Sequence, residues 1–129
     1  MYLEENVKCE EIWSCSHRNI YVNWVVEYTN CIKSVTELLK RRLFAGKSDE
    51  LYFWRDSNGI EIDVIEEDNL EIKAYEIKAS ETMNTAFFSN IKKIKEIAGL
   101  KAENTAIIYS GKSLPATSEN GANICWEEI

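Results

Sequence analysis

Residues 51–80, LYFWRDSNGIEIDVIEEDNLEIKAYEIKAS, decide the fold of this chain. Gly59 supplies a turn, and the alternation of apolar and acidic residues after it predicts a strand over residues 60–64. The two faces of this strand are expected to carry Ile60, Ile62 and Val64 on one side, and Glu61 and Asp63 on the other.

A hairpin is predicted to follow this strand. Residues 66–69 are acidic residues and an asparagine, which favour a turn, and residues 70–79 then return as a second strand. With the turn centred on its last two residues, Asp63 faces Ala74 across the ladder. Glu76 then lies at the diagonal position, on the same side of the sheet.

Three charged side chains therefore converge on one mostly apolar sheet face, namely Asp63, Glu76 and Lys78. Two carboxylates suit a hard, oxygen-seeking cation such as Mg2+ or Mn2+, and the lysine could orient a metal-bound water or neutralise a phosphate. The same spacing also fits a solvated sheet edge on which glutamate and lysine alternate. Both interpretations remain open from the spacing alone.

Three segments of this region carry a family resemblance: Phe53-Trp54-Arg55-Asp56, Gly59-Ile60-Glu61-Ile62-Asp63 and Glu76-Ile77-Lys78-Ala79-Ser80. They resemble the core of the restriction-endonuclease-like superfamily, PD-(D/E)XK. Within it, they are most similar to the C-terminal domain of unknown function that follows AAA-type ATPase domains in bacteria and archaea. The resemblance extends, more weakly, from about Ile20 to Trp126.

The resemblance implies an α/β fold, a restriction-endonuclease-like mixed β-sheet flanked by α-helices. It implies Mg2+-dependent or Mn2+-dependent hydrolysis of DNA, in which Asp63, Glu76 and the carbonyl of Ile77 hold the metal. Lys78 would position the nucleophile. DNA is the implied partner, together with an ATPase domain in the same chain or in another.

One position departs from the family pattern. Relatives that look catalytic often carry a glutamate directly before an Asn-aromatic-Val triplet, and here that position is Val22. Glu27 lies on the same predicted helix and could substitute from another turn. The departure favours the alternative function, a non-catalytic domain that keeps the nuclease fold and binds or regulates a protein partner.

Composition indicates one globular domain with an acidic balance. The chain has 129 residues, 45% of them hydrophobic, and a net charge of −7. Such a charge argues against coating nucleic acid through bulk electrostatics, although a local basic groove remains compatible with it. No apolar run approaches the roughly 20 residues that cross a bilayer, and the N-terminus lacks the pattern of a signal peptide, so we expect a cytoplasmic protein.

The remaining elements follow from periodicity. Residues 1–18 show no clear period and are left as an unassigned leader, before a nuclease-like domain at residues 19–129. The patterns predict helices over about 20–42 and 81–98, a strand buried on both faces at 105–109, and a last edge strand at 122–126. The predicted helix over 81–98 connects the Glu76 strand to strand 105–109, and this crossover implies that the two strands pair in parallel.

Two tripeptides resemble the end of a phosphate-binding loop, Gly46-Lys47-Ser48 and Gly111-Lys112-Ser113. That motif needs a glycine five residues before its second glycine, so that main-chain amides can wrap the phosphates. Here those positions are Arg41 and Ala106. We therefore expect no ATPase site in these residues.

Overall fold

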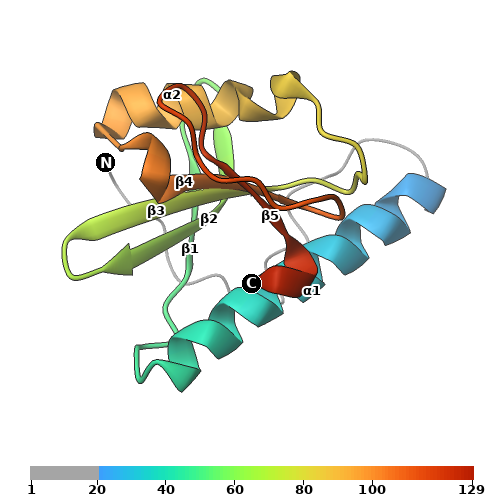
Figure 1. Cartoon of the computed structure of the whole chain (residues 1–129), viewed down its shortest axis with the longest axis horizontal. Coiled ribbons are helices and arrows are strands. Elements are labelled where there is room, and N and C mark those ends of the chain that lie inside the picture. Colours follow the sequence, from blue (N-terminus) through green and yellow to red (C-terminus); the bar gives the residue numbers. More distant parts are fainter. Residues whose placement is uncertain (1–20) are drawn as a thin grey trace.

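The computed structural model describes residues 21–129, with side chains from residue 29 onward. In this part of the chain a β-sheet lies between two α-helices, α1 on one face and α2 on the other (Figure 1). The elements, in chain order, are α1 (Tyr21–Phe44), β1 (Tyr52–Arg55), β2 (Glu61–Asp68), β3 (Glu71–Ile77), the 3-10 helix η2 (Thr85–Phe88), α2 (Ser89–Ala98), the 3-10 helix η3 (Ala102–Asn104), β4 (Thr105–Tyr109), β5 (Ala122–Cys125) and the 3-10 helix η4 (Trp126–Glu128).

The sheet has five strands in the order β1-β2-β3-β4-β5. Strands β1, β2 and β3 pair antiparallel, whereas β4 pairs parallel to β3 and β5 parallel to β4. Every residue of β4 is buried, as expected of a strand covered on both faces. The mixed sheet flanked by helices, the parallel pairing of β3 with β4 and the edge position of β5 are confirmed.

The core consists of two apolar layers, one on each face of the sheet. The layer under α2 contains Trp54, Ile62, Ile65, Ala74, Phe88, Ile91, Ile94, Ile107 and Tyr109. The layer under α1 contains Val35, Leu38, Leu51, Val64, Tyr75, Ala106 and Ile108. Because each face is covered by a different helix, a side chain on β2 or β3 meets either α1 or α2, and its partners follow from its face.

The hairpin turn lies one residue later than predicted. Asn69 and Leu70 both have positive φ, 50° and 73°, which is the pattern of a two-residue hairpin turn. The ladder then pairs Ile65 with Ala74, so the expected pairing of Asp63 with Ala74 is wrong by two residues. A shift of two keeps the parity of the strand, and each side chain stays on its expected side relative to β3.

A β-bulge interrupts β2. Strand β1 pairs Tyr52 with Ile65 but Trp54 with Ile62, so β2 has one extra residue between these two pairs. Ile62 lies in the apolar layer under α2, whereas Val64 lies in the layer under α1. The predicted common face of these two residues is therefore wrong, because the bulge interrupts the alternation.

The helices differ from the prediction at their ends. The second helix does not start at residue 81, because Asn84 accepts a hydrogen bond from the N–H of Ala86 and begins η2, from which α2 continues. Gly99 ends α2 with φ 65°, as expected. The leader, residues 1–18, lies outside the described residues. Within residues 21–129, the structure contains no helix of the length and apolarity needed to cross a membrane.

Candidate functional site

The bulge in β2 brings Asp63 to the end of β3. Extending the observed register by one pair sets this residue directly opposite Glu76. Oδ2 of Asp63 accepts a hydrogen bond of 2.7 Å from the main-chain N–H of Ile77, the residue after Glu76 on β3. Bulges commonly redirect a side chain beside an active site, and this one directs a carboxylate to the last residue of β3.

Glu76 lies on β3 with 2% of its surface exposed. The side-chain amide of Asn90, on α2, donates a hydrogen bond of 2.9 Å to its Oε1. The ammonium group of Lys78 lies 3.8 Å from the same oxygen and is 32% exposed. The structure thus brings Asp63, Glu76 and Lys78 together, on the sheet face that α2 covers.

The surroundings of Asp63 and Glu76, called here the carboxyl pair, disfavour a negative charge on Glu76. Burial raises the pKa of Glu76 to about 9, and the charge of Asp63 and a hydrogen bond with it act in the same direction. Lys78 and Asn90 oppose this shift and lower the pKa, but do not offset it. This shift favours the protonated form of Glu76 at neutral pH.

The donor set fits a hard divalent cation. Asp63 and Glu76 supply carboxylate oxygens, and the peptide group of Ile77 adjoins them through its hydrogen bond to Asp63. A cation between the two carboxylates would oppose both the burial and the charge of Asp63 that raise the pKa of Glu76, and its binding would favour loss of the Glu76 proton. Among the described residues, no group of three or more His, Cys, Asp or Glu could hold a metal, so the acidic ligands number two.

The structure leaves the third expected carboxylate untested. Val22 and Glu27 lie on α1, but their side chains are outside the described residues. The roles assigned to Asp63, Glu76, Ile77 and Lys78 stay predictions, although the positions of these residues are now known.

Sequence reasoning missed Asn90. Phe87, Ile91 and Ile94 are among the apolar residues of this helical region that pack toward the sheet. Asn90 follows Phe87 by three residues and precedes Ile94 by four, and so lies on the same helix face. A polar residue within an inward apolar stripe is a signal that could have been found in the sequence.

A family model supports part of the resemblance. The model described as "Domain of unknown function (DUF4143)" matches residues 34–127. The chain belongs to this family. The family is known in proteins associated with AAA-type ATPases. A search of curated proteins and a search of solved structures gave no significant match.

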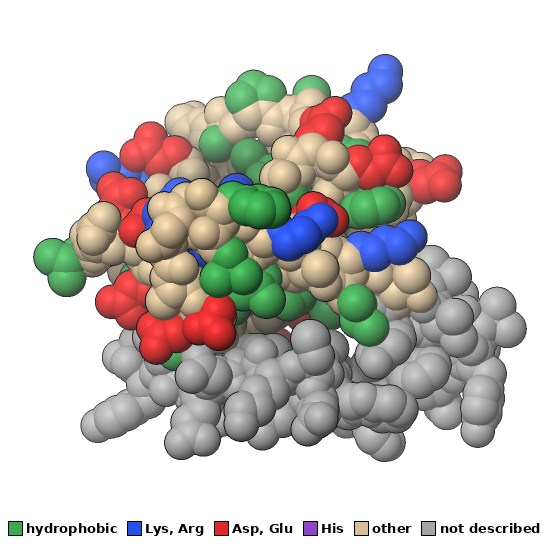
Figure 2. All heavy atoms as spheres, turned by 90° about the horizontal axis from the view of Figure 1, so that it is seen from below, with side chains coloured by type: hydrophobic (Ala, Val, Ile, Leu, Met, Phe, Trp, Pro, Cys, Tyr) green, Lys and Arg blue, Asp and Glu red, His purple; other side chains and the backbone are tan. Residues whose placement is uncertain are grey.

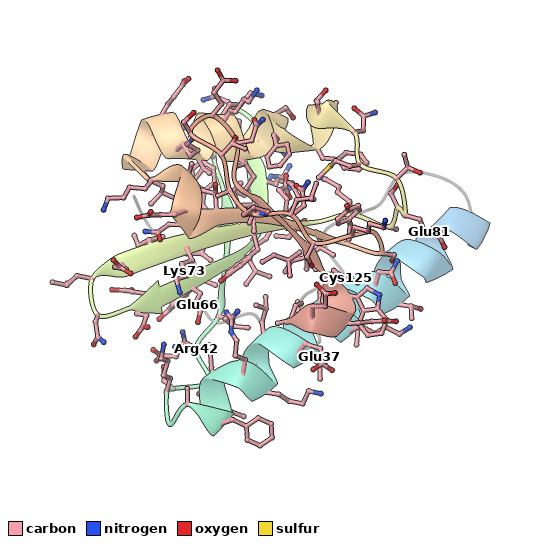
Figure 3. The ribbon with its side chains drawn as sticks, in the orientation of Figure 1. Glu37, Arg42, Glu66, Lys73, Glu81 and Cys125 are labelled. Carbon is pink, nitrogen blue, oxygen red and sulfur yellow. The ribbon has the colours of Figure 1, made fainter. Side chains whose placement is uncertain are left out.

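The DUF4143 domain has a second buried charged cluster, on the α1 face. Its centre is Glu66, which is 2% exposed and receives hydrogen bonds from Arg41 at 2.7 Å, Arg42 at 3.1 Å and the hydroxyl of Tyr75 at 3.0 Å. Figure 3 shows Arg42 directed from α1 toward Glu66 on β2. The prediction that Glu66 belongs to the hairpin turn is wrong, because this cluster, called here the Glu66 cluster, holds it inside the sheet.

Both Gly-Lys-Ser loops of the DUF4143 domain serve the fold. Lys47 forms an ion pair with Asp68, and Ser48 accepts two hydrogen bonds from Arg42. In the second loop, Gly111 packs so closely on the ring of Tyr109 that a Cβ atom would overlap with it.

The surface charge of the DUF4143 domain is mixed. Figure 2 shows acidic and basic side chains interspersed on one face, with apolar side chains between them. On α2, Lys92 and Lys93 are exposed. Lys95 is half-buried and donates a hydrogen bond of 3.1 Å to the carbonyl of Glu119. Lys92 and Lys93 are therefore the two exposed lysines of α2.

Proposed function

We propose that this DUF4143 domain is a metal-dependent phosphodiesterase that acts on DNA and has a restriction-endonuclease-like fold. The order of the elements supports the fold: a helix, three antiparallel strands, a helix, and a strand parallel to the third. An ATPase domain, in the same chain or in another, would supply nucleotide hydrolysis, because we expect no site for it in this domain.

One observation carries the proposal, the contact between two carboxyl groups in a nearly dry position. A protein that only needed to stabilise β2 against β3 would gain little from placing Asp63 beside Glu76, because both are acids and burial penalises the charge of Glu76. A pair of titratable groups whose environment shifts a pKa this far is typical of a functional site. Lys78 at the edge of the pair adds a group that can act on a phosphate.

Each residue of the candidate site would have a separate role in hydrolysis. Asp63 and Glu76, with the carbonyl of Ile77, would hold Mg2+ or Mn2+, and the bound cation would supply a more acidic water and neutralise charge on the phosphate. Lys78, half-exposed, faces solvent and the incoming phosphate, and it orients the water and stabilises the added negative charge. Water adds to phosphorus and one phosphorus–oxygen bond breaks, which leaves a phosphate monoester and a free hydroxyl group.

Metal binding tests the first half of this proposal. Mn2+ should raise the melting temperature of the wild-type chain, because a ligand that binds only the folded state stabilises it. Asp63→Asn and Glu76→Gln should remove this increment while keeping the size of each side chain. Glu71→Gln is the matched control, because Glu71 is exposed on the same strand as Glu76, and it should keep the increment.

DNA cleavage tests the second half. The wild-type chain with Mn2+ should nick supercoiled DNA, and Lys78→Ala should stop nicking while the Mn2+ increment in melting temperature persists. This separation follows because Lys78 is assigned to the water and phosphate rather than to the cation. A wild-type chain that shows neither a shift with Mn2+ nor a nick contradicts the proposal.

The second candidate function is a non-catalytic domain that binds or regulates a protein partner. It is favoured by the net charge of −7, which opposes approach to DNA, and by the presence of only two acidic ligands among the described residues. Under this alternative the carboxyl pair is a remnant, and Mn2+ changes neither the melting temperature nor DNA.

A further inference from the structure

The hydrogen bond from Asn90 to Glu76 joins α2 to the sheet at the candidate site. Asn90 is the second residue of α2, and the next turns of the helix are anchored by Ile91 and Ile94, both with no exposed surface. Its main chain is therefore fixed relative to β3. The amide reaches Oε1 of Glu76 at 2.9 Å from this rigid position.

The chemistry of the amide matters as much as its position. An asparagine side chain donates hydrogen bonds without carrying a charge, so it can hold a carboxylate oxygen and leave the negative charge of that carboxylate available. A lysine or arginine in its place would compete with a cation for Glu76. An aspartate would add a third carboxylate next to the pair.

The same oxygen also faces Lys78, at 3.8 Å. Oε1 of Glu76 is therefore occupied from two directions, by a neutral donor on α2 and by a cationic group on its own strand. The carboxylate cannot turn freely about its last bond while both contacts hold. This leaves the other oxygen as the one that can bind a ligand together with Asp63.

We propose that Asn90 is a positioning residue, which holds Oε1 of Glu76 so that the second carboxylate oxygen is presented, with Asp63, to a divalent cation. This inference rests on the proposed function, because it assigns a supporting role in the same site. Groups that orient metal ligands commonly change metal affinity by about 10–100-fold when they are removed. Asn90 is well placed for such a role because it joins the two layers that enclose the site.

Two substitutions in the full chain test the inference, with melting temperature followed over a titration with Mn2+. Asn90→Ala removes the donor, and the apparent Kd for Mn2+ should rise by about 10-fold or more. Asn90→Asp brings a third carboxylate beside Glu76, so it should lower the melting temperature without metal and enlarge the increment with Mn2+. Opposite effects in the two conditions would show that position 90 lies beside the carboxylates that bind the cation.

The control is Asn84→Asp, which makes the same charge change at the start of η2. Aspartate caps a helix as well as asparagine does, so this variant should match the wild type with and without Mn2+. A merely structural hydrogen bond predicts another pattern, in which both Asn90 variants lose the same stability with and without metal and keep the wild-type Kd. That result would overturn the positioning role and leave the proposed function standing.

The Mn2+ increment of the wild type also bears on both the proposed function and the positioning role of Asn90. If the wild type shows no Mn2+ increment and no DNA nicking, the proposed function fails. A new increment in Asn90→Asp would then show only that the added carboxylate completes a cation site, and the positioning role would fail with the proposed function. If wild type and both Asn90 variants all lack an increment, the inference fails together with the proposed function.

Discussion

Glu66 and Glu76 belong to the same hairpin, are equally buried, and lie on opposite faces of the sheet. Glu66 meets two arginines and a tyrosine hydroxyl from the α1 side. Glu76 meets another acid, Asp63, with one amide and one lysine as compensation. The same residue type in the same element thus has an environment that favours its charge on one face and opposes it on the other.

The difference separates a structural role from a functional one. Each oxygen of Glu66 has at least one charged donor, so the cluster is complete within the protein and ties α1 to β2. The carboxyl pair is incomplete, because Lys78 and Asn90 lower the pKa of Glu76 without offsetting the burial and the charge of Asp63 that raise it. A buried acidic group that the fold itself does not neutralise is the better candidate for binding something from outside.

Removing Glu66 should produce the largest effect on stability. Glu66→Ala leaves Arg42, only 4% exposed, without its carboxylate, and breaking such a pair costs about 3–5 kcal/mol of the free energy of unfolding. Urea denaturation measures the loss, and Glu67→Ala is the matched control, because its side chain is exposed on the same strand. Equal stability of the two variants would show that the Glu66 cluster does not hold α1 to the sheet.

The carboxyl pair should instead affect how the free energy of unfolding depends on pH. The folded pKa of Glu76, about 9, lies above its unfolded value, so its stabilising contribution is complete below the unfolded pKa and is lost as pH rises through the folded one. In EDTA, the free energy of unfolding of the wild type should therefore fall from pH 5 toward pH 9. Glu76→Gln does not titrate and should lack this part of the slope, whereas Glu71→Gln should keep it. Parallel profiles for the wild type and Glu76→Gln would contradict the account.

The sequence predicted the carboxyl pair better than it predicted the Glu66 cluster. Asp63 and Glu76 were assigned to one side of the sheet from strand parity, and this assignment survives a register error of two residues because parity is unchanged by an even shift. The bulge could not be foreseen, since it depends on pairing with β1, which is a tertiary contact. It nevertheless decides where the Asp63 carboxylate points.

Glu66 was misread for a physical reason. Acidic residues are rarely buried, so a run of three before an asparagine favours a turn. The two arginines that make its burial tolerable precede it by 24 and 25 residues, and no local pattern links them. Asn90 was missed for the opposite reason: its place within the apolar stripe was visible, but the acid that it binds lies on another element.

The hairpin turn fixes the register on which the carboxyl pair and the Glu66 cluster depend. A substitution in this turn should raise the free energy of unfolding, by less than the loss expected for Glu66→Ala. Leu70 is 95% exposed and has a left-handed backbone, a conformation that glycine adopts without a steric penalty. Leu70→Gly creates an Asn-Gly turn and should raise the free energy of unfolding by about 0.5–1 kcal/mol. Leu70→Ala keeps the Cβ atom and should give no such gain. A loss of stability in Leu70→Gly would mean that the Leu70 side chain has a role in the fold after all.

The last prediction is that no effect is seen. It concerns Lys47 and Lys112, which lie outside the carboxyl pair and the Glu66 cluster. Lys47 is engaged by Asp68 next to the Glu66 cluster, and the carbonyl of Lys112 accepts a hydrogen bond from the hydroxyl of Tyr109. Neither loop has main-chain amides arranged by the preceding glycine that a phosphate needs. Calorimetric titration with Mg-ATP should therefore give no saturable heat beyond that of MgCl2 at the same free Mg2+ concentration. Micromolar binding of ATP that persists in Asp63→Asn would place a nucleotide site in one of these loops, and the carboxyl pair would no longer be the sole candidate for binding a ligand among the described residues.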